Sequence, residues 1–519
     1  MKASKAPKTI HPKGELKNNE NELAERVVDS YGGVVRVNWD PEAEVTQFGQ
    51  LVYFVEFLKT AGLFDKWVED CPLKYSSNNG SSKQDVLGTI MLSLLAGHKR
   101  YAHITNIRSD QVTPELLGMS KVVSEDAVRR ALISMDKKES AQWLKQHLGK
   151  CSEALLTEPW ILDIDSTVKP LYGKQEGAVL GYNPQKPGRP SHVYHTYFAA
   201  NVRMILDTEV QPGNQVSAMH AQPGLWAYLD DIPKKSLPQF VRGDCAWGNE
   251  RVMQEAEKRG IHFLFKLKQS ANVKRLINRA FARKDWGDAG QGWEGIDEQM
   301  ALSGWTKDRR VIVLRRLIKE SIVIADAAPA LGQIPLAIID GVGPIAKYEY
   351  AILVTSMKEE IFSLAQHYRD RADIENVFDE MKNQWSWGGY TTQDLARCQI
   401  ISRTAALVFN WWSLFSGLAF PDRHAEAITT RPLLLHAVGR QTRHAGQKTV
   451  TITSSHAQNS SVRKVLTAVS VFLCKLKQTA EQLTDLQRWQ LILSRIFIRF
   501  LRGRIIGKHP PDILALVAA

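Results

Sequence analysis

The residues best suited to chemistry are three carboxylates that lie far apart in the sequence. Asp165 ends an apolar run in PWILDIDSTV, and Asp244 follows another in PQFVRGDCAWGNE. Glu375 belongs to HYRDRADIENVFDEMKNQW, which has helical periodicity. Three carboxylates around one pocket repel one another unless a divalent cation lies between them. Oxygen ligands favour Mg²⁺ or Mn²⁺, and such ions can activate a water or a 3′-hydroxyl for attack on a phosphodiester.

The segment around Glu375 adds cations to the same helical face. Tyr368, Arg371, Glu375 and Lys382 lie at offsets of 0, 3, 7 and 14 residues, which places them along one narrow stripe of a continuous helix. An apolar stripe beside it predicts the buried side. Arg371 and Lys382 are suited to hold phosphates beside a metal, and Tyr368 to donate a hydrogen bond or to stack.

Periodicity leaves two alternatives open among these acids. Asp163 shares its strand face with Asp165, and Asp379 shares the helical stripe of Glu375. Each acid taken alone is more often a turn, cap or surface residue than a catalytic group. The residue pattern therefore predicts a carboxylate site without choosing within these pairs.

The elements that must position these residues indicate a mixed α/β fold with helical flanks. After residue 156 the pattern runs through three strands, a helix, a strand, a helix and a strand, and a β-rich stretch follows. The predicted units are a flexible basic arm (1–40), a helical DNA-binding region (41–155), the first part of the core (156–269), a β-rich insertion (270–357), the core helix with the catalytic Glu (358–390), and a helical basic region for DNA or dimer contacts (391–519).

Composition points to a polyanionic partner. The 519 residues are 44 % hydrophobic and carry a net charge of +12, which suits nucleic acid or an anionic membrane. Five dispersed cysteines indicate a reduced, intracellular protein, and the polar start lacks the apolar core of a signal peptide. The uncharged stretch 404–420 contains Asn410 and is short for a span, so it predicts a buried core helix rather than a membrane helix.

Two basic features suit contacts with DNA. Arg129 and Arg130 lie on a helix that Ser124 is expected to cap, within a region compatible with a helix-turn-helix reader; an ordinary helical bundle explains them equally well. Lys186 and Arg189 lie in the loop NPQKPGRPSH, which can follow a phosphate backbone or be a plain solvated loop.

The spacing of Tyr368, Arg371, Glu375 and Lys382 resembles the YREK signature of bacterial insertion-sequence DDE transposases. The segment that starts with Asp165, DST, is similar to the one that begins with the first catalytic aspartate of that family. This resemblance favours Asp165 over Asp163. It implies a ribonuclease H-like core, interrupted by a β-rich insertion, in which Asp165, Asp244 and Glu375 are catalytic and bind Mg²⁺, with Mn²⁺ as a substitute.

The resemblance also implies a reaction and its partners. Water nicks double-stranded DNA at the terminal inverted repeats, and the freed 3′-hydroxyl attacks a second strand without a covalent protein–DNA intermediate. A homodimer on paired ends, a cytoplasmic, nucleoid-associated location and no membrane partner are expected. Trp293 and Trp305 can stack on a flipped base, although core packing explains them as well. The alternatives are a transposase-derived DNA-binding protein that no longer cuts and a standalone nuclease of the same fold.

Overall fold

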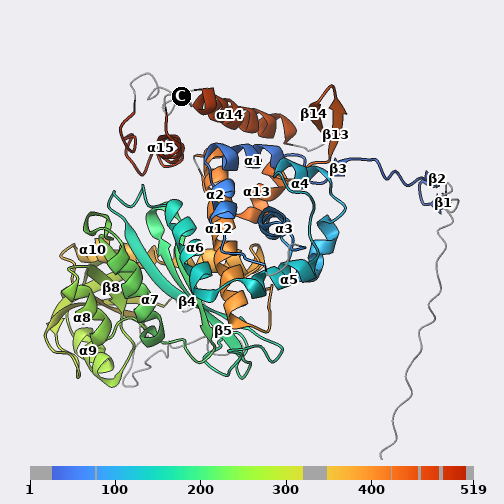
Figure 1. Ribbon diagram of the computed structural model, residues 1–519. Helices are drawn as coiled ribbons and strands as arrows, with labels where there is room; N and C mark the ends of the chain where they lie inside the picture. The colour runs from blue at the N-terminus through green and yellow to red at the C-terminus, as the bar shows by residue number, and fades with distance from the viewer. Residues whose placement is uncertain are drawn as a thin grey trace, which may run out of the picture.

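A mixed sheet of nine strands forms the core of one lobe of the computed structural model (Figure 1). The structure describes residues 26–75, 79–318, 348–421, 423–453, 458–478 and 483–509. Residues 1–25 of the predicted arm and 319–347 of the predicted insertion thus lie outside the described part. The strand order is β6-β5-β4-β7-β8-β12-β11-β10-β9. The strands are β4 (Ile161–Pro170), β5 (Ser191–Ala199), β6 (Met204–Pro212), β7 (Phe240–Gly243), β8 (His262–Lys266), β9 (Gly287–Gly290), β10 (Trp293–Met300), β11 (Arg309–Leu317) and β12 (Tyr348–Thr355).

The direction of the strands divides the sheet into two parts. β4, β7 and β8 are parallel neighbours, whereas β5 and β6 extend the sheet antiparallel from β4. On the other side, β12 pairs antiparallel with β8, and β11, β10 and β9 follow antiparallel. The strands of the β-rich stretch therefore continue the central sheet. The associated helices are α7 (Ala218–Asp231), α8 (Glu250–Lys258), α9 (Ala271–Phe281), α10 (Ile361–Arg369) and α11 (Ala372–Asn383).

Helices from both ends of the chain form a second lobe beside the sheet (Figure 1). A hairpin of β1 and β2 precedes it, and β3 joins the hairpin of β13 and β14. The bounds are β1 (Arg26–Ser30), β2 (Gly33–Val37), β3 (Val45–Thr46), α1 (Leu51–Thr60), α2 (Phe64–Glu69), α3 (Lys83–Leu95), α4 (Val112–Leu116), α5 (Glu125–Ser134), α6 (Lys137–Lys150), α12 (Leu395–Ala419), α13 (Ala427–Leu434), β13 (Gly439–His444), β14 (Gln447–Ile452), α14 (Asn459–Gln478) and α15 (Asp485–Ile496).

Helix α12 joins the two lobes and closes one edge of the sheet. The side-chain amide of Asn410 donates to the carbonyl of Ile205 at 2.8 Å and accepts from its N–H at 3.0 Å. Gln399 accepts from the N–H of Val210 at 2.7 Å and donates to the carbonyl of Thr208 at 2.8 Å. Because β6 is an edge strand, these amides satisfy backbone groups that would otherwise be unpaired.

The burial of α12 confirms that residues 404–420 form a core helix. Asn410, the polar residue within that apolar run, is fully buried, and its hydrogen bonds to β6 compensate for the loss of water. Across the described ranges, no helix combines the length and apolar character needed to cross a bilayer.

Side-chain caps fix the start of helices on both lobes. The hydroxyl of Ser124 accepts from the N–H of Ala127 at 3.2 Å, which confirms it as the N-cap of α5. Asn249 caps α8 in the same way, through the N–H of Val252 at 3.2 Å. The cap of α8 lies five residues after Asp244 and so sets the geometry of the turn that carries this acid.

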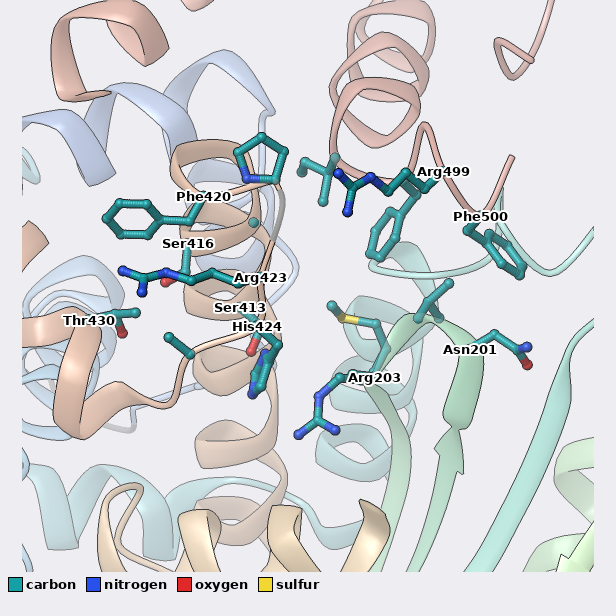
Figure 2. Close-up of a pocket in the computed structure, with 17 residues that line it drawn as sticks. Asn201, Arg203, Ser413, Ser416, Phe420, Arg423, His424, Thr430, Arg499 and Phe500 are labelled. Carbon is teal, nitrogen blue, oxygen red and sulfur yellow. The ribbon is translucent and has the colours of Figure 1, made fainter. Parts of the chain in front are cut away.

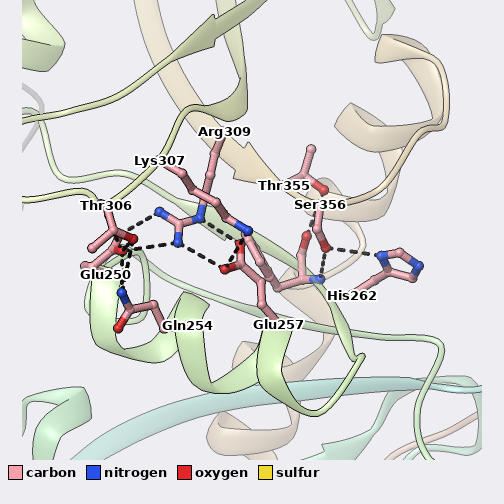
Figure 3. Close-up of polar contacts among 10 residues, drawn as sticks. Glu250, Gln254, Glu257, His262, Thr306, Lys307, Arg309, Thr355 and Ser356 are labelled. Carbon is pink, nitrogen blue, oxygen red and sulfur yellow. Dashed lines mark hydrogen bonds and ion pairs between the residues drawn. The ribbon is translucent and has the colours of Figure 1, made fainter.

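An ion-pair cluster ties the added strands to α8 (Figure 3). Arg309, at the start of β11, is buried, and its Nε lies 2.8 Å from Glu257 Oε1. The same guanidinium contacts Glu250 at the first turn of α8. A buried cation shared by two carboxylates holds its partners in one geometry. The added strands and the helix that follows Asp244 are thus joined directly.

Candidate active site

The pairing of β4 with β7 brings two of the predicted acids to the same level of the sheet. Ile164 pairs in parallel with Gly243, so Asp165 and Asp244 occupy the next positions on adjacent strands. Asp244 lies beyond the end of β7, where its Oδ1 accepts from the N–H of Ala246 at 2.9 Å. One strand pairing thus brings together Asp165 and Asp244, which are 79 positions apart in the sequence.

The carboxylate of Asp165 is largely enclosed. Its side chain is 13 % exposed, and its Oδ1 accepts from the N–H of Ser166 at 2.8 Å. Burial raises the pKa of Asp165 to about 6; the charge of Arg371 opposes the rise and that of Asp244 adds to it. A carboxylate in this position gains from any cation that neutralises it.

The segment that carries Glu375 is two helices rather than the continuous helix predicted for residues 367–385. α10 ends at Arg369 and α11 begins at Ala372, with Arg371 as its N-cap residue. The prediction that Tyr368 to Lys382 share one face of a continuous helix was therefore wrong. The break instead places Arg371 between the helices, where its side chain points to the sheet and is 11 % exposed.

Arg371 links the first and third predicted acids. Its Nη1 lies 2.7 Å from Asp165 Oδ2, and its Nη2 lies 2.8 Å from Glu375 Oε1. The Glu375 side chain is 60 % exposed and so has room to move. The structure thus gathers Asp165 and Glu375 around a single positive charge, with Asp244 at the neighbouring strand end.

Tyr368 and Lys382 also belong to this site. The ring of Tyr368 lies 5.7 Å from the Arg371 guanidinium carbon, and burial raises the pKa of its hydroxyl to about 12, so it stays protonated at neutral pH. Burial lowers the pKa of Lys382, while the charges of Asp379 and Asp165 oppose the shift. Both residues of the predicted stripe therefore lie within electrostatic range of Asp165, although no continuous helix aligns them.

The structure gives Asp163 a structural role. Asp163 is fully buried, and its Oδ2 accepts from Arg242 Nη2 at 2.9 Å, across the β4–β7 pairing. The same guanidinium donates to the carbonyl of His367 in α10. Asp379, the other alternative, is bonded to Asn383 at 2.8 Å on the exposed side of α11. Both alternatives therefore have partners outside the Asp165–Glu375 pair.

The donor set fits a divalent cation by its chemistry. Three carboxylates offer the hard oxygen ligands that Mg²⁺ and Mn²⁺ prefer, and Arg371 shows that a cation is stabilised between two of them. Among the described residues, no group of three His, Cys, Asp or Glu side chains is already arranged to hold a metal. Arg371 occupies the position between Asp165 and Glu375, where a metal ion would compete with it.

The loop after β4 approaches the same site. Burial raises the pKa of Tyr182, and the charge of Asp244 adds to the rise, so this loop residue lies within electrostatic range of Asp244. Lys186 and Arg189 are exposed on the loop and lie 5.1 and 4.7 Å from the Tyr172 ring. These two predicted DNA contacts thus lie on a loop that borders the acids.

Sequence reasoning missed how this loop is held. Glu176 Oε2 accepts from the N–H of Leu395 at 2.9 Å, and the Glu176 N–H donates to the Gln393 carbonyl at 2.9 Å. Glu176 therefore fastens the loop to the start of α12. The sequence around Glu176 gave no signal of this role, because the partners of Glu176 are backbone groups more than 200 residues away.

The remaining predicted DNA contacts lie on α5 and on the added strands. Arg129 on α5 lies 3.6 Å from Glu125 and faces the Tyr101 ring, whereas Arg130 is exposed. In the added strands, Arg316 lies 5.0 Å from the Trp293 ring and Arg309 lies 5.4 Å from the Trp305 ring. Both tryptophans thus have partners within the chain, and their contact with DNA stays a prediction.

Comparison with known proteins identifies the class. Residues 44–472 match the family model described as "Transposase DDE domain group 1". The chain belongs to this family of DDE transposases, in which divalent metal ions are generally used. A solved piggyBac transposase synaptic complex with hairpin DNA is similar at 12 % identity and a TM-score of 0.36, over 90 % of this chain and 87 % of that one. The search of curated protein sequences returned no match.

Proposed function

We propose that this transposase cuts and joins double-stranded DNA at the ends of a bacterial insertion sequence, with Asp165, Asp244 and Glu375 as its catalytic acids. The observation that carries the proposal is the convergence of β4, β7 and α11 on one carboxylate site bridged by Arg371. The strand order β6-β5-β4-β7-β8 supports a ribonuclease H-like core. A homodimer on paired ends in the cytoplasm completes the proposal.

Asp165, Asp244 and Glu375 would hold Mg²⁺, or Mn²⁺ in its place. The bound ions would supply Lewis-acid chemistry there, for activation of the attacking water and stabilisation of the leaving oxygen at phosphorus. The buried position of Asp165 keeps bulk water from its carboxylate, which strengthens its electrostatic interactions. The acids thus define where the scissile phosphate must lie.

The cations of the site are suited to orient the DNA. Once Arg371 leaves the carboxylates, its planar guanidinium can grip a backbone phosphate through two hydrogen bonds. Lys382 adds a point charge on the same helix as Glu375, and protonated Tyr368 can donate a hydrogen bond to a phosphate oxygen. Water attacks first, and the 3′-hydroxyl so formed is the nucleophile of the joining step.

Incubation of the purified protein with Mg²⁺ and DNA carrying the ends of its own element tests this proposal. We expect nicking at the ends, followed by joining of the 3′-hydroxyl to a second DNA. Binding without nicking would favour a transposase-derived protein that no longer cuts. Nicking without joining would favour a standalone nuclease. The presence of all three acids in one site favours an active enzyme over a protein that no longer cuts.

A further inference from the structure

A basic cavity lies outside the carboxylate site, between the two lobes (Figure 2). Its volume is about 260 Å³, and it is enclosed by the turn between β5 and β6, the C-terminal half of α12 and the segment that follows α15. Leu162 at the start of β4 pairs with Ala199 immediately before that turn. The cavity is therefore at the beginning of β4, whereas the loop that approaches Asp244 follows the end of β4.

The charge of the lining is one-sided. Arg203, Arg423, His424 and Arg499 line the cavity, and no Asp or Glu of the described residues does. Figure 2 shows Arg203 beside His424, with Arg499 across the cavity from them. Burial lowers the pKa of His424 to about 4, so the positive charge at neutral pH comes from the three arginines. Three cationic side chains in a concave site favour an anionic ligand.

Two buried polar atoms of the lining have no hydrogen-bond partner. They are Nε of Arg203 and the hydroxyl of Ser416, a residue only 8 % exposed. An unsatisfied buried donor is destabilising, so both atoms gain from a ligand that brings acceptor oxygens. These two donors therefore point to the same class of ligand as the charges do.

The backbone and neighbours of Arg203 hold it at the cavity. Its φ of 53° lies in the left-handed region, which is uncommon for arginine and fixes the turn after β5. Nη1 of its guanidinium pairs with Asp373 of α11, and this contact does not use Nε. His424 Nε2 lies 3.9 Å from Glu380 Oε2 on the other side. The acids near the cavity thus contact these side chains from outside its lining.

We propose that this cavity binds a backbone phosphate of DNA and so anchors the nucleic acid at a second, non-catalytic point. Phosphate oxygens can accept from the donors of this lining, and a phosphate offers more acceptor oxygens than a carboxylate ligand does. The rings of Phe420 and Phe500 lie at opposite sides of the cavity and add apolar surface that suits an attached sugar or base. The assignment of the phosphate to DNA rests on the proposed function. The expected affinity of the cavity for phosphate is independent of that function.

The first test uses calorimetric titration of the full chain in EDTA, with inorganic phosphate and with thymidine 5′-monophosphate as probes. We expect both to bind, and Arg499→Gln and Arg203→Asn each to weaken binding by about tenfold. Asn tolerates the left-handed backbone at position 203, so this variant keeps the turn. Arg440→Gln, at an exposed arginine of β13, is the matched control and should bind as the wild type does. Equal phosphate affinity in all four proteins would overturn the site.

The second test separates DNA from a free nucleotide as the source of the phosphate. We expect Arg499→Gln to lower the slope of duplex affinity against salt concentration by about one, whereas Arg440→Gln leaves it unchanged. Loss of phosphate binding with an unchanged duplex slope would overturn the assignment to DNA. Because both tests are run without metal and without cleavage, a failure of the proposed catalytic acids leaves their outcome unaffected.

Discussion

Arg371 and Asp165 form a 2.7 Å ion pair that joins the break between α10 and α11 to the central sheet. The same guanidinium lies 2.8 Å from Glu375. A side-chain cation therefore already contacts two of the three acids and offsets part of their charge. A metal ion that binds these acids must compete with Arg371, and the released arginine becomes available for a phosphate of the DNA.

Replacement of Arg371 by Gln should raise the affinity of the DNA-free protein for Mn²⁺. The variant loses the competing positive charge but keeps the three carboxylates, so we expect binding to tighten by about tenfold. Electron paramagnetic resonance of free Mn²⁺ measures this affinity. Arg369→Gln is the control, because Arg369 donates to the Ala289 carbonyl and not to the acids. Unchanged or weaker Mn²⁺ binding in Arg371→Gln would show that Arg371 does not compete with the metal.

Neutral replacement of the proposed ligands should abolish cleavage and leave binding of DNA ends intact. We expect Asp244→Asn and Glu375→Gln to lose at least about a hundredfold in nicking rate, the effect of several kcal/mol of lost metal stabilisation. Asp379→Asn is the matched control on α11, because Asp379 bonds to Asn383 and not to Arg371. Near-normal nicking by Glu375→Gln would remove this residue from the site.

Asp163→Asn should reduce stability, because it leaves the guanidinium of Arg242 buried without a counter-charge. Removal of one partner from a buried pair typically costs about 3 kcal/mol or more. Denaturant unfolding measures the change in the free energy of unfolding. Asp230→Asn breaks the exposed pair with Arg259 and should have little effect. A stable but inactive Asp163→Asn would instead assign Asp163 to the chemistry.

Strand periodicity predicted much of the region that holds Asp165 and Asp244. Alternation along 161–170 placed Asp163 and Asp165 on one face, and the structure shows both on β4 beside β7. Periodicity cannot distinguish two residues on one face of a strand. The different roles of Asp163 and Asp165 depend on Arg242, which lies opposite Asp163 in the parallel pairing. Such a partner becomes visible only when the strand order is known.

The helix around Glu375 shows a second limit of periodicity. The spacing from Tyr368 to Lys382 fits one helix, yet the chain breaks between Arg369 and Ala372. The segment contains no Pro or Gly to signal a stop. The break follows from contacts with distant parts of the chain, among them the ion pair of Arg371 with Asp165. A tertiary contact of this kind leaves no local mark in the sequence.

The lysine beyond Asp165 on β4 should make stability depend on pH. Lys169 is buried and donates to the Gly389 carbonyl, and burial lowers its pKa to about 8. Between pH 8 and 10 the unfolded chain therefore binds more protons than the folded chain, so the free energy of unfolding rises with pH.

Comparison with Lys169→Met isolates this contribution. From pH 7.5 to 10, we expect the stability of the wild type relative to Lys169→Met to rise by on the order of 2 kcal/mol in urea unfolding. Lys358→Met, at an exposed lysine, should show a constant difference from the wild type over this range. A constant difference for Lys169→Met as well would mean that Lys169 is not charged and buried at neutral pH.

Anomalous diffraction from Mn²⁺, in crystals of the protein with a DNA end, tests the metal site most directly. We predict a peak within about 2.5 Å of carboxylate oxygens of both Asp165 and Asp244, with Glu375 turned toward it and Arg371 on a phosphate. A Mn²⁺ peak elsewhere, or none near these two aspartates while the DNA end is bound, would contradict the account.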